Sequence, residues 1–178
     1  SINKVTCNVS GGRPITKIFR NEMKIESEQI SKIDLIKLQK GNLPKEIDNY
    51  KLLSSSVIKY YVDDYTPVDN PIGLYAQKLI LDMSYTYAQD SVLKNIFNAI
   101  DLCHLKVDKV IITPEASGIA SAFQDEKNNG VIVIDLGGHL TSIGIFKNNN
   151  LIFSDTIPIG GLHITSDIVR GLGCKAED

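Results

Sequence analysis

The order of hydrophobic and polar residues divides the first part of the chain into short strands and one helix. Val5–Val9 alternates before a glycine pair and predicts a strand. A second short strand is expected over residues 15–20. Ser31 then offers an N-cap to a helical pattern that ends at Gly41. The opening segment therefore predicts strand, strand, helix.

Two longer stretches, residues 50–62 and 77–87, have the β-branched and aromatic content of half-buried strands, and the second alternates as one buried face requires. The proline-containing segment between them, residues 66–74, predicts a turn. Asp90 is expected to cap an amphipathic helix, with Cys103 on its apolar stripe as a buried, reduced thiol. These elements predict a compact α+β module.

The second half predicts a buried strand over residues 106–113 and a helix with Thr113 as its cap and Pro114 at its first position. Three strands joined by tight turns follow, over residues 131–136, 141–146 and 151–159. A last helix is expected from about Ile164. A three-strand meander followed by a helix is thus predicted at the end of the chain.

Composition narrows the function classes. With 178 residues, 43% hydrophobic and 22% charged residues, the chain has the composition of a soluble globular protein of one domain or two small ones. A net charge of -2 supplies no basic field for nucleic acid. No apolar run approaches the roughly 20 residues of a membrane span, and no secretory signal is seen, so we expect a cytoplasmic protein. The three cysteines lack disulfide-type or zinc-type spacing.

The candidate chemistry lies in the turn between the first two strands of the meander. Glycines such as Gly137 and Gly138 let backbone amides approach an anion, and Asp135 at the strand end can hold a hydrated magnesium ion. The alternative is a plain β-hairpin bend in which the aspartate caps its own turn. A second glycine pair, Gly160 and Gly161, ends the same meander and leads into a helix.

With this context, residues 131–168 resemble the second phosphate-binding region of the actin and Hsp70 superfamily of ATPases. Within that superfamily the chain resembles the FtsA family of bacterial cell-division proteins. Four strings carry this resemblance: "NPIGL" at 70–74, "LKVDKVI" at 105–111, "PEASGIASAF" at 114–123 and "PIGGLHITSDI" at 158–168. We interpret the chain as an internal part of such a protein.

The resemblance implies the fold class: an α/β protein with an α+β insert, which is a partial actin-like (RNase H-like) ATPase core carrying an inserted SHS2-type strand-helix-strand subdomain called 1C. The implied domains are the end of the first actin-like subdomain (1–19), the inserted subdomain 1C (20–104), a return to the first subdomain (105–128), and the start of the second (129–178).

The resemblance also implies the site. The nucleotide-binding and phosphate-binding residues would be Asp135, which would also position magnesium through water, Gly137, Gly138, His139, Thr141, Gly160 and Gly161. ATP and magnesium would bind the full-length protein, and neither is expected to bind tightly to these residues alone. This chain departs from the family at His139 and Leu140, where a third glycine and a threonine are usual. Histidine tolerates the left-handed backbone region, but its imidazole occupies space beside the phosphates, so we expect weaker nucleotide binding. An altered but working site and a catalytic histidine are the alternatives.

Other polar residues have structural interpretations. We expect Thr165 to be an N-cap and Asp167 a favourable charge in the first turn of the last helix, with His104 at a helix end and His163 on the surface. Most tyrosines of the α+β module are expected in its core. Four residues at or near the proline turn are expected to contact proteins: Tyr65, Pro71, Gly73 and Tyr75.

By resemblance, the function is a scaffold that links the division-ring protein FtsZ to the cytoplasmic face of the inner membrane. It would also recruit later division proteins and self-associate under the control of ATP. Its membrane helix would lie outside this sequence. Any ATP hydrolysis would be weak, and no catalytic residue is assigned. The alternatives are a PilM-like scaffold of type IV pilus assembly, a phosphotransferase of the same superfamily, and a peptide-binding α+β module.

Overall fold

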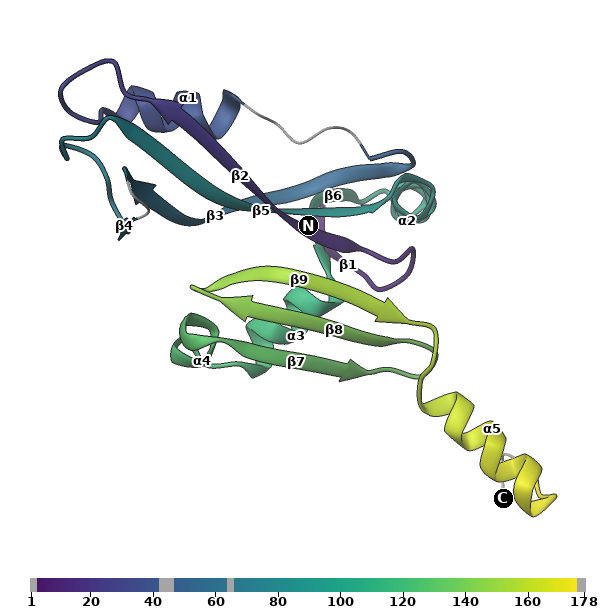
Figure 1. Ribbon diagram of the computed structural model, residues 1–178. Coiled ribbons are helices and arrows are strands. Elements are labelled where there is room, and N and C mark those ends of the chain that lie inside the picture. The colour runs from purple at the N-terminus through teal and green to yellow at the C-terminus, as the bar shows by residue number, and fades with distance from the viewer. Residues whose placement is uncertain (1–2, 42–46, 64–65, 176–178) are drawn as a thin grey trace.

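A computed structural model describes residues 3–41, 47–63 and 66–175. Its strands form three sheets (Figure 1). The two-stranded sheet pairs β1 (Lys4–Val9) with β6 (Lys106–Ile112) in parallel. The four-stranded antiparallel sheet has the order β2 (Ile15–Lys24), β5 (Lys78–Gln89), β3 (Tyr50–Val62) and β4 (Thr66–Val68). The three-stranded antiparallel sheet consists of β7 (Val131–Leu136), β8 (Thr141–Lys147) and β9 (Asn150–Ile157).

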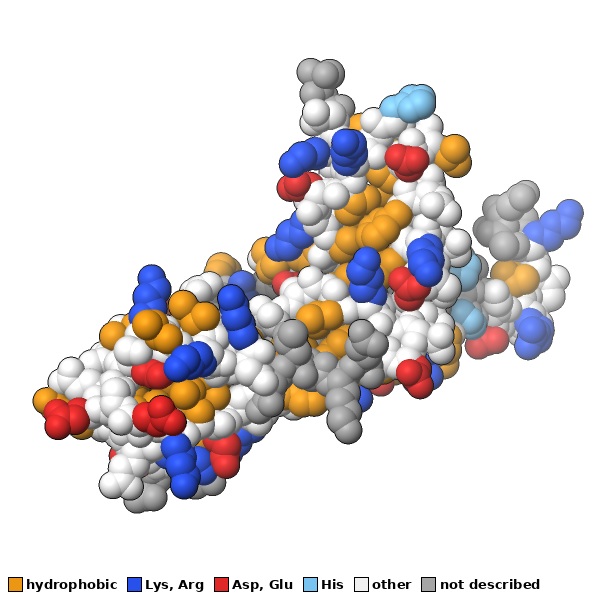
Figure 2. Space-filling model, turned by 90° about the horizontal axis from the view of Figure 1, so that it is seen from above, with side chains coloured by type: hydrophobic (Ala, Val, Ile, Leu, Met, Phe, Trp, Pro, Cys, Tyr) orange, Lys and Arg blue, Asp and Glu red, His pale blue; other side chains and the backbone are white. Residues whose placement is uncertain are grey.

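The helices are α1 (Lys32–Gly41), α2 (Asp90–Leu102), α3 (Thr113–Ser121), α4 (Gln124–Asn129) and α5 (Gly161–Leu172). In Figure 1, α1 covers the four-stranded sheet, α3 lies on the three-stranded sheet, and α5 extends away from the rest of the chain. Within the described residues, no helix is both long and apolar enough to cross a bilayer. Lys and Arg side chains alternate with Asp and Glu over the face shown in Figure 2.

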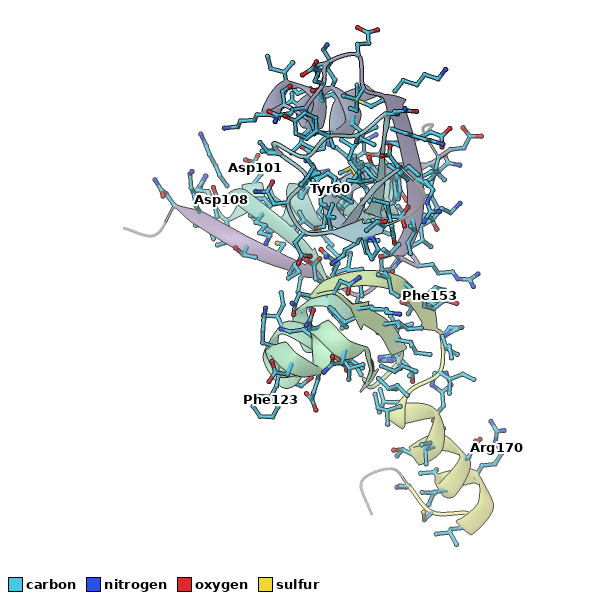
Figure 3. All side chains as sticks on the ribbon, turned by 60° about the vertical axis from the view of Figure 1, so that its left-hand side comes forward. Tyr60, Asp101, Asp108, Phe123, Phe153 and Arg170 are labelled. Carbon is cyan, nitrogen blue, oxygen red and sulfur yellow. The ribbon has the colours of Figure 1, made fainter. Side chains whose placement is uncertain are left out.

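The largest core lies between the four-stranded sheet and α1. Leu79, Leu81 and Tyr85 of β5 are almost completely buried there, with Leu38 of α1 above them. Tyr60 belongs to the same cluster and lies among the crowded side chains of this unit in Figure 3. Since apolar burial contributes about 25 cal/mol per Å², this cluster is a main source of the module's stability.

The prediction of a single buried face for β5 is wrong. Asp82, Ser84 and Thr86, on the opposite face, are also buried. The reason is that β9 and its neighbours cover part of this second face. Thr16 Oγ1 and Ser154 Oγ lie 2.9 Å apart, and Asn150 Nδ2 donates to Val57 O at 3.0 Å. Hydrogen bonds made by polar side chains, to a side chain and to the backbone, therefore join the module to the three-stranded sheet.

Glu115 of α3 lies beside this polar contact and lines a small cavity of about 100 Å³ together with Ser56, Ser84 and Lys127. Burial raises the pKa of the Glu115 carboxyl above its ordinary value of 4.5, and the nearby charge of Lys109 opposes the rise. The folded protein therefore holds this proton more tightly than the unfolded chain does. The resulting stability is present at acid pH and is lost as the pH rises through the folded-state pKa.

We therefore expect Glu115→Gln to have a higher free energy of unfolding than the native protein at pH 7, because glutamine removes a desolvated charge. The difference should shrink steadily as the pH falls to 4. Denaturant unfolding at the two pH values measures it. Glu28→Gln, which neutralises an exposed carboxylate, is the control. If Glu115→Gln raised the free energy of unfolding by the same amount at both pH values, the result would contradict a raised pKa of Glu115 in the folded protein.

Several helix boundaries differ from the predicted ones. Asp90 is the first residue of α2 rather than its cap, and its carboxylate pairs with Lys94 at 2.6 Å. Thr113 is likewise the first residue of α3, and its hydroxyl donates to Asn8 Oδ1. Both side chains therefore form interactions other than an N-cap hydrogen bond. The short helix α4 was not predicted, since its sequence is entirely polar.

The predictions for Cys103, for the strand before α3 and for the proline segment need correction. Cys103 is exposed because α2 ends at Leu102, which places the thiol in the following turn. The strand β6 is buried only at Ile112, since within the described residues its one sheet partner is β1. Thr66–Val68 forms the short strand β4 rather than part of a turn, and it pairs with the end of β3.

Candidate functional site: the paired glycine turns

The predicted phosphate turn connects β7 to β8 and comprises Gly137–Leu140. It is closed by a hydrogen bond from Gly137 N to Leu140 O at 2.9 Å. None of its residues has a positive φ. The left-handed backbone that the sequence analysis allowed for His139 is therefore not used, and histidine fits this turn without backbone strain.

The second glycine pair lies directly against this turn. The amides of Gly161 and Leu162, at the start of α5, donate to Gly137 O and Gly138 O, both at 2.9 Å. A Cβ atom on Gly160 would lie 2.4 Å from Gly137 O and 2.5 Å from Gly138 O. Close backbone approach therefore requires glycine at position 160. Of the glycine residues proposed for the site, the structure brings all four together.

The carboxylate of Asp135 lies half-buried near the end of β7, one strand residue before the turn. It accepts a hydrogen bond from Ser117 Oγ of α3. This bond orients the carboxylate and links the site to the helix. The sequence analysis missed Ser117. Ser117 lies within "PEASGIASAF", which was used only as one of the strings that carry the resemblance, although a serine in it was the available signal.

The structure gives less support for a ligand-binding role of the remaining site residues, Thr141 and His139. The Thr141 hydroxyl donates to Ile159 O at 2.7 Å, so its proton serves the strand-to-helix connection. His139 is exposed. The amides of Gly138 and His139 donate to no group in the described part of the chain. These two amides and the Asp135 carboxylate are the groups that a phosphate and a hydrated cation would use, so the turn fits both.

The start of α5 also differs from the prediction. The helix begins at Gly161, so Thr165 lies inside it and donates to Gly161 O, and Asp167 lies beyond the first turn. His163 is exposed, as expected, and its Nδ1 accepts from Gly160 N at 3.1 Å. The early start arises because the turn carbonyls accept the first helical amides. His104 follows the end of α2 with a φ of 58°.

The four proposed protein-contact residues have different environments. Tyr75 is 70% exposed, and Gly73 is exposed with a φ of +85°, as its turn requires. The side chain of Pro71 is almost fully buried, so its selection as a contact residue is wrong. Tyr65 lies outside the described residues. Ile72 and Leu74, which the sequence analysis did not select, are 46% and 40% exposed beside Tyr75.

Comparisons of the sequence with a family model and with curated relatives agree on one family. The family model "Cell division protein FtsA" matches residues 132–178. Cell division protein FtsA of Agrobacterium fabrum is 30% identical over 179 residues, which cover 100% of this chain and 40% of that protein. FtsA of Neisseria meningitidis is 30% identical over 96% of this chain and 42% of its own length. FtsA of Escherichia coli K12 is 30% identical over 74% of this chain and 31% of its own length.

A solved structure supports the fold. The PilM-PilN type IV pilus biogenesis complex matches 98% of this chain and 48% of its own chain, with a TM-score of 0.60 at 14% identity. This likeness and the family matches support the expected actin-like ATPase fold. The chain spans about 40% of the length of the first relatives. Over the region that it spans, the chain belongs to the FtsA family of cell-division proteins.

Proposed function

We propose that the full protein is an FtsA-type cell-division scaffold that links FtsZ to the membrane at the division site and recruits later division proteins. The observation that carries this proposal is the similarity to FtsA along the whole chain, at 30% identity to the Agrobacterium fabrum protein. The likeness to the PilM-PilN complex concerns the fold alone, because its sequence identity is 14%. It therefore gives no reason to prefer a pilus function.

We further propose that the glycine turn binds the phosphates of ATP. The amides of Gly138 and His139 would donate to phosphate oxygens, and Asp135, held by Ser117, would position magnesium through water. No group of three or more metal-ligating side chains occurs among the described residues. Water and phosphate oxygens would therefore supply most magnesium ligands. Bound ATP would supply a charged ligand that favours one subunit conformation and so regulates self-association.

We assign the inserted SHS2-type subdomain 1C, expected over residues 20–104, and the first actin-like subdomain, expected over residues 1–19 and 105–128, with one change of boundary. Because β2 (Ile15–Lys24) pairs with β5 along its whole length, the insert begins at Ile15 rather than at residue 20. Residues 129–178 then begin the second subdomain. Support for the insert comes from its own core between the four-stranded sheet and α1. Three apolar side chains of one loop, Ile72, Leu74 and Tyr75, are exposed, and we propose that they contact neighbouring subunits or division partners.

Co-sedimentation of the full-length protein with FtsZ polymers tests the scaffold proposal. We expect the protein to pellet with FtsZ and, in cells, to localise as a fluorescent fusion at the division ring. Depletion of the protein should give long undivided cells. A protein that stays in the supernatant, localises elsewhere and can be lost without a division defect would refute the proposal.

A further inference from the structure

A second cavity, of about 330 Å³, borders the glycine turn: Leu140 of the turn lines it, whereas Gly137 and Gly138 do not. One wall is the segment Ser10–Arg13, which connects β1 to β2. The opposite wall consists of Leu140, Thr156 and Pro158 from the three-stranded sheet and its connections. The volume lies in the range of about 300–1,000 Å³ that is typical of small-molecule sites.

The Ser10–Arg13 wall is held firmly in place. A Cβ on Gly12 would lie 2.8 Å from the Val92 side chain, so this glycine packs tightly on α2. Arg13 O accepts from the Tyr50 hydroxyl at 3.2 Å, and Pro14 O accepts from Ser154 Oγ at 3.4 Å. Gly11, in contrast, has no atom within 4 Å of its Cβ position. The segment is thus fixed on its outer sides and open beside Gly11.

The only charge in the lining of this cavity is positive. Arg13 is the only charged residue that lines the cavity, and its guanidinium forms no ion pair or hydrogen bond with the described residues. The amides of Gly11 and Gly12 likewise donate to no group in the described part of the chain. Donors and a permanent positive charge are available here without a carboxylate, and this combination favours an anion.

Thr156 adds a polar group without a partner. Its side chain is 3% exposed, and its hydroxyl has no hydrogen-bond partner among the described residues. Buried hydroxyls are normally paired because leaving one unpaired costs free energy. Leu140 and Pro158 give the same side of the cavity an apolar surface. A ligand for this space would therefore have an apolar body as well as a charged end.

We propose that this cavity binds a small organic anion. Its carboxylate or phosphate would pair with Arg13 and the Gly11 and Gly12 amides, and its apolar body would pack on Leu140 and Pro158. The Thr156 hydroxyl would gain a partner when the walls adjust to the bound molecule. This site shares Leu140 with the glycine turn but uses none of the groups proposed to hold ATP, and it does not depend on ATP binding.

Calorimetric titration of the full-length protein with phenyl phosphate at low salt tests the proposal. Two matched probes separate the contributions of the charged group and the apolar body to binding. Inorganic phosphate lacks the apolar body, and benzyl alcohol lacks the charge. We expect phenyl phosphate to bind at least about tenfold more tightly than either probe, since both the charge and the apolar surface contribute.

Two substitutions locate the binding. Arg13→Gln should weaken phenyl phosphate binding about tenfold or more, because it removes the charge-assisted hydrogen bonds. Lys17→Gln removes an exposed charge from the adjacent strand β2, outside the cavity, and should leave binding unchanged. Thr156→Val keeps the shape of the side chain and should weaken binding about fivefold while the protein stays folded.

Saturating magnesium-ATP distinguishes the two sites. Phenyl phosphate should still bind in its presence, with Arg13→Gln still defective. Competition by ATP would mean that phenyl phosphate occupies the glycine turn, and this would overturn the proposal. Equal loss of binding in Arg13→Gln and Lys17→Gln, or no binding by the native protein, would overturn it as well. A failure of the native protein to bind phenyl phosphate would leave the ATP proposal unaffected, so the two proposals can fail independently.

Discussion

Replacement of Gly160 by alanine is expected to lower the free energy of unfolding by about 2–3 kcal/mol. The added Cβ would lie 2.4–2.5 Å from Gly137 O and Gly138 O, which are backbone atoms that cannot rotate away. The start of α5 must then move from the glycine turn, which breaks the hydrogen bonds that Gly161 N and Leu162 N donate. Denaturant unfolding of the variant measures the loss.

Gly161→Ala is the matched control for this experiment. Its Cβ would meet only Gly137 O, at 3.9 Å, which is an ordinary contact. Because alanine is favoured over glycine in a helix, this variant should be neutral or more stable by up to about 1 kcal/mol. Equal effects of the two substitutions would contradict the close approach of the two glycine pairs.

Replacement of Gly118 by alanine is expected to destabilise the protein by about 2–3 kcal/mol. A Cβ at this position of α3 would lie 2.2–2.3 Å from ring carbons of Phe146. Phe146 is only 3% exposed and is part of the core cluster beneath the helix, so the ring has little room to move. Thermal and denaturant unfolding should both detect the change.

Gly171→Ala makes the same substitution in α5, where nothing lies within 4 Å of the added Cβ. It should stabilise the protein slightly, by about 0.5–1 kcal/mol, through helix propensity alone. If Gly118→Ala behaved in the same way, the packing of α3 on β8 would be wrong.

The local pattern was enough to find most elements. β3 has the predicted bounds, because its β-branched and aromatic residues leave little choice of conformation. The meander β7–β9 also matches its prediction, and the helix after it begins earlier, at Gly161. The two glycine pairs, far apart in sequence, meet in the structure because β7 and β9 flank the same strand.

Contacts between segments that are far apart along the chain could not be predicted from the sequence. Nothing local distinguishes Ser84 and Thr86 from residues that face solvent, and only the position of β9 explains their burial. The bond from Ser117 to Asp135 likewise depends on where α3 crosses the sheet. The predicted helix included Cys103, whereas α2 ends one residue earlier, at Leu102. This difference of one residue places the thiol on the surface rather than in the core.

The proposal that the glycine turn binds ATP phosphates has consequences at position 139. His139 belongs to the turn, so we expect its imidazole to take up space beside the proposed phosphate site, whereas glycine there would leave that site open. His139→Gly should therefore bind magnesium-ATP more tightly than the native protein, by about tenfold, as expected for relief of a steric obstruction worth about 1.4 kcal/mol.

Calorimetric titration of magnesium-ATP into the full-length protein and its His139→Gly variant is the most direct test of this account. We predict binding by both proteins, with the variant tighter. Absence of binding by both would contradict the assignment of Gly137–Leu140 as a phosphate turn.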